Sequence, residues 1–209
     1  MSVCRAFPFV QFPLEKDSRK VYNYSTNKEL NDFLFFMDVI SHILIGRGIA
    51  TPSGIPKRNV YFITFFSFLP DLPQIAIYLY LGFINSRPFF MPLNTDWNGF
   101  RALHPLWSAI WEIPHSIFFA LLIILPVILI FRLPKMALVV YLLHIFIDLF
   151  THTGEWGTKI FYPLHYKIDG FTNAWSWSFI NIFSSWIILT LTIVILHSFF
   201  RYKTSTNKT

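Results

Sequence analysis

Apolar residues are grouped along this chain in long runs separated by short polar stretches. A helix of about 20 apolar residues crosses the hydrocarbon core of a bilayer, which is about 30 Å thick. Runs at residues 60–84, 106–131, 179–200 and the first half of 136–163 therefore predict transmembrane helices. A further run, residues 30–50, either spans the bilayer or lies along its surface as an amphipathic helix. The pattern predicts an all-α membrane protein, a helical bundle of four to five transmembrane segments.

The span at residues 60–84 is interrupted by the sequence Leu69-Pro70-Asp71-Leu72-Pro73. Proline has no backbone N–H, so the helix is expected to break between Leu69 and Pro73. Inside lipid, such a break is tolerated only where protein or a wet cavity covers the freed carbonyl groups. We therefore expect Asp71 to point into the protein interior.

The composition agrees with a membrane protein. Of the 209 residues, 54% are hydrophobic and 13% are charged, which does not describe a soluble globular domain. We expect an N-terminal tail at residues 1–29, one integral membrane domain at residues 30–200 and a basic C-terminal tail at residues 201–209. The first of these has no signal-peptide pattern and is expected to be cytosolic or interfacial.

The net charge of +6 lies mostly in the predicted tails and loops. Anionic lipid headgroups account for such a charge, so the predicted partner is the lipid bilayer and no nucleic acid. The distribution of Lys and Arg does not orient the chain if residues 30–50 span the membrane. If those residues lie in the interface, the same count favours both termini in the cytoplasm.

Ionisable residues within apolar runs are candidate functional groups, because they are costly in lipid. His144, Asp148 and His152 follow one another at four-residue steps and therefore form a stripe along one face of a helix. Imidazole and carboxylate groups on such a stripe suit a divalent metal ion. The single cysteine, Cys4, leaves nitrogen and oxygen as the expected ligand atoms.

Polar residues from several segments fall at a similar predicted depth in the membrane. When residues 60–84 start at one surface, Asp71 lies near mid-depth, and His115 lies about three turns or fewer from the opposite surface. By the same comparison of depths, His144 and Asp148 lie at a similar depth in the membrane. His42 does so too if residues 30–50 span the membrane. Such a set exceeds what one tetrahedral zinc needs and would suit one or two ions, most plausibly zinc. The candidate metal ligands are His42, Asp71, His115, His144 and Asp148.

The same residues carry a resemblance to a known family. Their motifs occur in the order His42 in SHILIG, Asp71 in FLPDLP, His115-Ser116 in IPHSIFF, and His144-x-x-x-Asp148-x-x-Thr151-x-x-Gly154 followed by Tyr162-Pro163. This order resembles the membrane-bound metal-dependent hydrolase family over residues 30–163. The resemblance implies a small multi-pass protein of the cell inner membrane. More distantly, the ligand order is similar to that of the all-helical zinc-dependent phospholipase C enzymes, which implies phosphoester chemistry.

Two positions depart from the family pattern. Members often carry a second acidic residue and a histidine soon after the LPD motif, where this chain has Pro73 and Gln74. They also often carry an HRG triplet before the HS pair, and here the sequence Trp111-Glu112-Ile113-Pro114 stands instead. Either the ligand set is smaller in this chain, or Glu112 and His104 substitute.

The main hypothesis is a membrane-bound metal-dependent hydrolase. The metal would lower the pKa of a bound water, and the resulting hydroxide would attack a phosphoester. A lipid is the favoured substrate, because the predicted site lies near the headgroup level. Glu112 or His152 would act as general base or acid.

Two alternatives stay open from the sequence. In a metal-ion or proton transporter, the broken helix at Leu69 to Pro73 would form part of the pathway. The short chain and the lack of an inverted repeat speak against transport, although a homodimer would answer the first objection. In a non-catalytic membrane scaffold, the polar residues would only cross-link helices.

Overall fold

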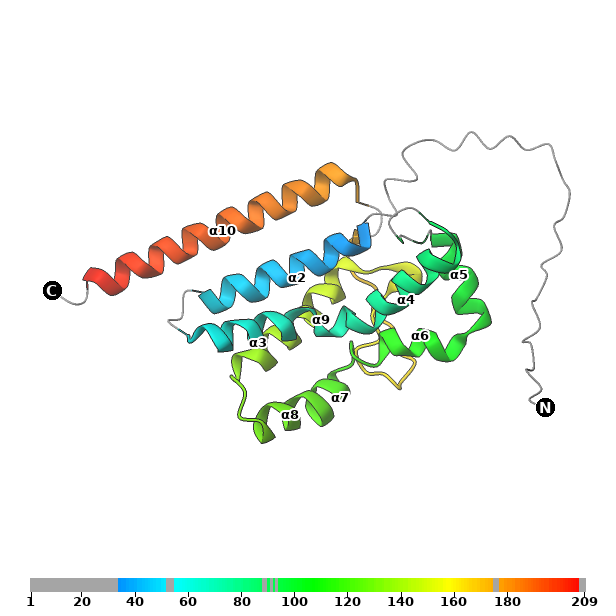
Figure 1. Cartoon of the computed structure of the whole chain (residues 1–209), viewed down its shortest axis with the longest axis horizontal. Helices are drawn as coiled ribbons and strands as arrows, with labels where there is room; N and C mark the ends of the chain where they lie inside the picture. The colour runs from blue at the N-terminus through cyan, green and yellow to red at the C-terminus, as the bar shows by residue number, and fades with distance from the viewer. Residues whose placement is uncertain are drawn as a thin grey trace, which may run out of the picture.

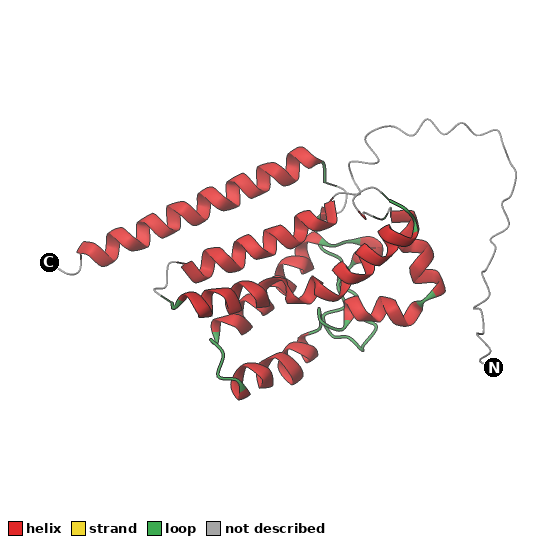
Figure 2. Ribbon diagram, in the orientation of Figure 1, coloured by secondary structure: helices red, strands yellow, loops and turns green. Residues whose placement is uncertain are grey.

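A computed structural model of the chain describes residues 34–51, 55–87, 90, 92, 94–174 and 177–206. These residues are mainly helical, and within these ranges the sole β-type pairing is an isolated bridge between Thr158 and Ile168 (Figure 2). The predicted all-α class is confirmed for this part of the chain. The predicted tail at residues 1–29 lies outside the described residues, as do residues 207–209 of the C-terminal tail.

Most helices follow one another with short connections, whereas residues 152–178 form a long connection between α9 and α10 (Figure 1). In chain order they are α2 (Leu34–Ala50), α3 (Lys57–Phe68), α4 (Leu72–Ile84), α5 (Asn94–Leu103), α6 (Pro105–Glu112), α7 (Ile117–Phe119), α8 (Leu125–Ile130), α9 (Met136–Thr151) and α10 (Phe179–Thr206). Three shorter helical segments are η2 (Leu69–Asp71), η4 (Ala120–Ile124) and η5 (Gly154–Trp156). Helix α10 thus continues into the stretch predicted as a C-terminal tail.

Helices α2, α3 and α9 form the centre of the molecule. Helix α2 packs on α3, α3 packs on α9, and α10 lies along the outside of α2 (Figure 1). Their shared core contains Ile63, Phe66 and Val140, and it also takes Ile124 from η4 and Ile128 from α8. A second apolar cluster joins α4 to α5 through Tyr78 and Trp97, among others. The ionisable residues of interest lie on η2, in the turn after α6 and on α9.

The break predicted between Leu69 and Pro73 is present. The α-helical geometry ends at Phe68, whose backbone adopts φ −118° and ψ 3°, and η2 then leads into α4. Pro70 and Pro73 have no N–H to donate to the preceding turn, which explains why one continuous α-helix does not form. Asp71 lies at the end of this tight turn and is buried.

The predicted span at residues 106–131 is not one continuous helix. Helix α6 ends at Glu112, and a second helical stretch begins after Ser116, whose Oγ accepts a hydrogen bond from the Phe118 backbone N–H at 3.2 Å. Pro114 explains the interruption, because it can neither donate to nor fit against the preceding turn. The interruption places His115 in a turn, where its direction does not follow helical periodicity.

Within the part of the chain that the structure describes, two helical stretches are long and apolar enough to cross a membrane, judged by length and composition. They are Lys57–Ile84, which comprises α3, η2 and α4, and Ile180–Phe199 within α10. The other predicted spans are shorter in the described structure, and Met136–Thr151, for example, rises only about 24 Å. A bundle of four to five spans is therefore not confirmed.

Candidate metal centre

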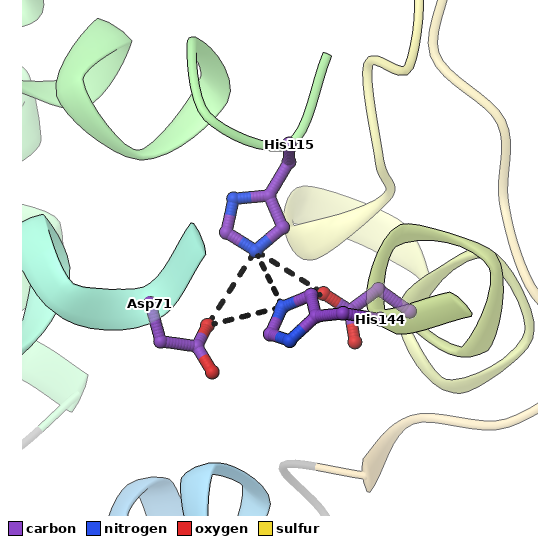
Figure 3. Close-up of side chains that lie close together, drawn as sticks. Asp71, His115 and His144 are labelled. Carbon is purple, nitrogen blue, oxygen red and sulfur yellow. Dashed lines mark hydrogen bonds and ion pairs between the residues drawn. The ribbon is translucent and has the colours of Figure 1, made fainter. Parts of the chain in front are cut away.

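Four ionisable residues from three parts of the chain meet in the interior. Asp71 ends η2, His115 lies in the turn after α6, and His144 and Asp148 lie one turn apart on α9. All four are buried, with at most 5% of each residue exposed. Figure 3 shows the rings of His115 and His144 and the carboxylate of Asp71 directed toward one another. One potential ligand atom from each residue lies within 4.8 Å of the others, so this group could hold a metal ion.

Five of the six separations between these atoms are close to those of a tetrahedral site. His144 Nε2 lies 3.1 Å from Asp148 Oδ2, 3.2 Å from His115 Nε2 and 3.6 Å from Asp71 Oδ1. His115 Nε2 lies 3.2 Å from Asp148 Oδ2 and 3.4 Å from Asp71 Oδ1. Nitrogen and oxygen ligands about 2.0–2.1 Å from a tetrahedral zinc ion lie about 3.3 Å from one another. The observed range therefore leaves room for one ion at the centre of the four atoms.

Backbone carbonyls orient both imidazole rings. His115 Nδ1 lies 2.7 Å from the carbonyl oxygen of Trp111, and His144 Nδ1 lies 2.7 Å from that of Ser67. A carbonyl oxygen only accepts hydrogen bonds, so each Nδ1 carries the proton and, in a neutral ring, Nε2 carries the lone pair. Metal-binding histidines commonly donate their second N–H in this way. Two Nε2 lone pairs and two carboxylates thus face one point, an arrangement that a cation stabilises.

Packing around the centre fixes these carbonyls in place. The Tyr141 hydroxyl, one turn before His144, donates a hydrogen bond of 2.5 Å to the Pro114 carbonyl and so ties α9 to the turn that carries His115. Helix α2 approaches Ser67 closely at Gly46, where any Cβ would collide with the Ser67 side chain. The missing side chain at Gly46 therefore allows α2 to cover the part of α3 that orients His144.

His42, the fifth predicted ligand, lies beside the four residues. Its Nε2 is 3.1 Å from Asp148 Oδ1, whereas His115 and His144 contact the other oxygen, Oδ2. The His42 ring stacks on that of His144 with 3.6 Å between centroids. His42 is therefore placed to hold the Asp148 carboxylate in position or to reach a second ion on its Oδ1 side. Direct ligation by His42 stays a prediction.

The two predicted acid–base residues are placed differently. His152 is buried, and its Nδ1 lies 3.9 Å from Asp148 Oδ1 and 3.2 Å from the Asp148 carbonyl oxygen. Glu112 instead forms an ion pair of 2.5 Å with Lys159. His104, considered as a substitute ligand, is exposed and contacts the Phe100 ring. The catalytic roles of Glu112 and His152 stay predictions, with His152 in direct contact with a residue of the cluster.

Gln74, one of the departures from the family pattern, is a buried polar residue close to the centre in sequence. Gln74 lies one turn after Asp71 and is fully buried. Among the described residues, neither polar atom of its side chain has a hydrogen-bond partner, and the same is true of Asp71 Oδ2. Buried polar atoms normally bind protein, water or a ligand. The α4 side of the centre therefore has unused hydrogen-bonding capacity.

Comparison with known proteins assigns no family to this chain. No protein-family model, no curated protein and no solved structure matches it. The fold and the cluster together define an all-helical protein with a buried His/Asp group that could bind a metal ion. The resemblance to membrane-bound metal-dependent hydrolases stays a prediction from sequence motifs.

Proposed function

We propose that this chain is a membrane-embedded metal-dependent hydrolase that acts on phosphoesters. In this proposal a zinc ion is held by Asp71, His115, His144 and Asp148. The observation that carries the proposal is the spacing of 3.1–3.6 Å between the facing ligand atoms, with both imidazole Nδ1 atoms already hydrogen-bonded to carbonyls. The mixture of two imidazoles and two carboxylates suits zinc among the common divalent metals.

A membrane location is supported by how little of the apolar surface is covered by protein. In the Ile180–Phe199 stretch only 6% of the apolar segment is buried by the rest of the protein, whereas the core helix of a soluble protein is mostly buried. Large apolar side chains also face outward elsewhere, for example Leu122 and Ile130, each at least 70% exposed. Extended apolar surface of this kind marks contact with lipid or with another protein. We place the chain in the cell inner membrane as a multi-pass protein.

In the proposed reaction, the bound ion supplies a polarised phosphoryl oxygen and an activated water. The residues of the chain position the ion and exclude bulk solvent, because all four ligands are buried. His42 contacts Oδ1 of Asp148, which would leave Oδ2, the oxygen that faces His115, to bind a metal ion. His152, next to the same carboxylate, is the group we assign to proton transfer.

A purely structural metal site is the second candidate. One observation favours it: the chain offers four ligands, as many as a structural zinc site uses, whereas catalytic zinc sites usually keep one position open. Hydrolysis at this centre therefore requires the ion to accept a fifth ligand. Activity measurements on the metal-loaded protein separate the two candidates.

The experiment begins with the full chain purified in detergent and analysed for bound metal. We expect about one ion per chain in the wild type and less than a tenth of that in His144→Ala and Asp148→Ala. His197→Ala is the matched control, because His197 lies in an apolar helix away from the cluster and should leave the metal content unchanged. Hydrolysis of nitrophenyl phosphate esters and of phosphatidic acid in mixed micelles is then measured.

The possible results point to different functions. Bound metal with hydrolysis that disappears in both cluster variants supports the proposal. Bound metal without hydrolysis of any phosphoester supports the structural site. A wild-type protein that retains no metal after reconstitution contradicts both and leaves paired imidazolium and carboxylate groups, the scaffold alternative, as the explanation of the cluster.

A further inference from the structure

A cavity of about 680 Å³ lies between α4, α5 and α6. Its wall is mostly apolar and includes Ile77 and Ile110, while its polar side-chain groups belong to Tyr80, His104 and Trp107. These last three residues are all exposed, so the polar groups lie where the cavity opens. The volume falls within the range of about 300–1,000 Å³ typical of small-molecule sites.

Two residues of the cavity wall are close in sequence to residues of the metal centre. Pro73 in its wall follows Asp71 by two residues, at the start of α4. Ile110 in its wall directly precedes Trp111, whose carbonyl orients His115. The two segments that line one side of the cavity therefore each lead into a residue of the centre within about one or two helical turns.

Aromatic contacts connect the cavity with the centre through space. Phe100 of the cavity wall stacks on Trp97 at 6.1 Å, and Trp97 stacks on Trp156 at 6.0 Å. Trp156 contacts Trp111 edge-on at 6.3 Å, and Trp111 lies 5.0 Å from His115, all measured between ring centroids. A ligand that fills the cavity would thus lie on one side of a continuous apolar wall that ends at the metal centre.

A cation stands beside this aromatic wall. The Arg101 Cζ atom lies 5.3 Å from the Trp156 ring centroid, and no carboxylate in the described part of the chain forms an ion pair with it. The guanidinium group is well suited to phosphate oxygens, because it presents several N–H donors in a planar fork. Arg101 therefore adds a positive charge available to an anionic head group.

We propose that the substrate of the function proposed above is an amphiphilic phosphoester with a long hydrocarbon chain, and that this chain occupies the cavity between α4, α5 and α6. The phosphate lies at the metal centre, with Arg101 beside the head group. A hydrocarbon chain fits better than a protein segment because the cavity opens next to exposed Leu103 and Leu106, 66% and 84% exposed, where acyl chains of a bilayer would lie. A phosphoester without a hydrocarbon chain would make no apolar contacts with the cavity wall.

The test uses two brominated probes, bromododecyl phosphate and bromododecanol, which quench tryptophan fluorescence on contact. We expect both to quench the full-length protein in detergent, and Trp107→Phe to remove a large part of the signal, because Trp107 lines the cavity. Ala76→Phe fills the cavity and should weaken binding of both probes at least tenfold. The matched control is Leu79→Phe, on the same helix but outside the cavity wall, which should change affinity less than twofold.

A double variant, His144→Ala with Asp148→Ala, separates this inference from the function on which it rests. It should weaken the phosphate probe at least tenfold and leave the alcohol probe unchanged. Equal affinity of Ala76→Phe and wild type, in an Ala76→Phe protein that retains wild-type metal content, would overturn the cavity assignment. If the double variant loses its metal and still binds the phosphate probe as the wild type does, the head group does not sit at the metal and the substrate assignment fails. A metal-free wild type, seen by elemental analysis, instead contradicts the proposed function itself.

Discussion

Helices α9 and α10 are both rich in apolar residues, but protein covers much more of α9 than of α10. Helix α9 buries a stripe that contains Val140, Tyr141, His144 and Asp148 against α2, α3 and η4. Of the α10 side chains that the structure describes, only Ile182 is buried. Apolar composition therefore predicts that a helix is shielded from water. The positions of ionisable residues predict which face of the helix packs against other parts of the protein.

The difference predicts where substitutions will be felt. A change on the buried stripe of α9 alters contacts with three other segments and changes the cluster that could hold a metal ion. In the proposed membrane location, a change on the outer face of α10 would alter contact with lipid, which adapts to a new side chain more easily than a packed core does.

The largest expected effect is the response to metal removal. Chelation of the wild type should lower the free energy of unfolding by about 3–4 kcal/mol, if the ion is present at 100 to 1,000 times its dissociation constant. The measurement is the midpoint of thermal or denaturant unfolding in detergent with and without a chelator. Asp148→Ala should not bind the ion, so its unfolding midpoint should not change with the chelator. If the wild-type midpoint is also unchanged by the chelator, no bound ion stabilises α9 and the expected difference from α10 is absent.

A charge on the outer face of α10 tests the lipid side of the comparison. Ile188 is 64% exposed, and Ile188→Asp should cost about 2.5–3.5 kcal/mol of membrane insertion. The expected result is loss of protein from the membrane fraction after expression. Ile188→Ala is the matched control and should fractionate as the wild type does. Full membrane retention of Ile188→Asp would mean that α10 faces protein or water.

Removal of one hydroxyl tests how firmly α9 holds the turn that carries His115. Tyr141→Phe leaves the buried Pro114 carbonyl without its donor and should reduce the free energy of unfolding by about 1–3 kcal/mol. Metal affinity should fall with it, measured by competition with a chromophoric chelator. Tyr61→Phe, at a residue that is 67% exposed, should change neither quantity.

The smallest of these effects concerns the approach of α2 to α3. Gly46→Ala forces a methyl group against Ser67 and should cost about 1–3 kcal/mol of stability, with weaker metal binding because Ser67 orients His144. Gly99→Ala, in helix α5 with open space around it, should be neutral or stabilising by up to about 1 kcal/mol. Equal stability of the two variants would show that α2 does not approach Ser67 as described.

The sequence alone determined those features that depend on near neighbours in the chain. The break at Leu69 to Pro73 follows from two residues that cannot donate a backbone hydrogen bond, and the pairing of His144 with Asp148 follows from the pitch of a helix. The helical class follows from long apolar runs, because in a nonpolar environment the backbone must satisfy its own hydrogen bonds.

Only the tertiary structure decided which distant residues meet. It placed Asp71, His115, His144 and Asp148 around one point, with His42 on the far oxygen of Asp148 and Glu112 on Lys159. It also divided residues 106–131 into two helical stretches and formed the cavity beside the centre. The physical reason is that helix packing and the backbone carbonyls of Ser67 and Trp111 set these positions. Every residue has a carbonyl group, so the sequence of side chains does not indicate which carbonyls will orient the two histidines.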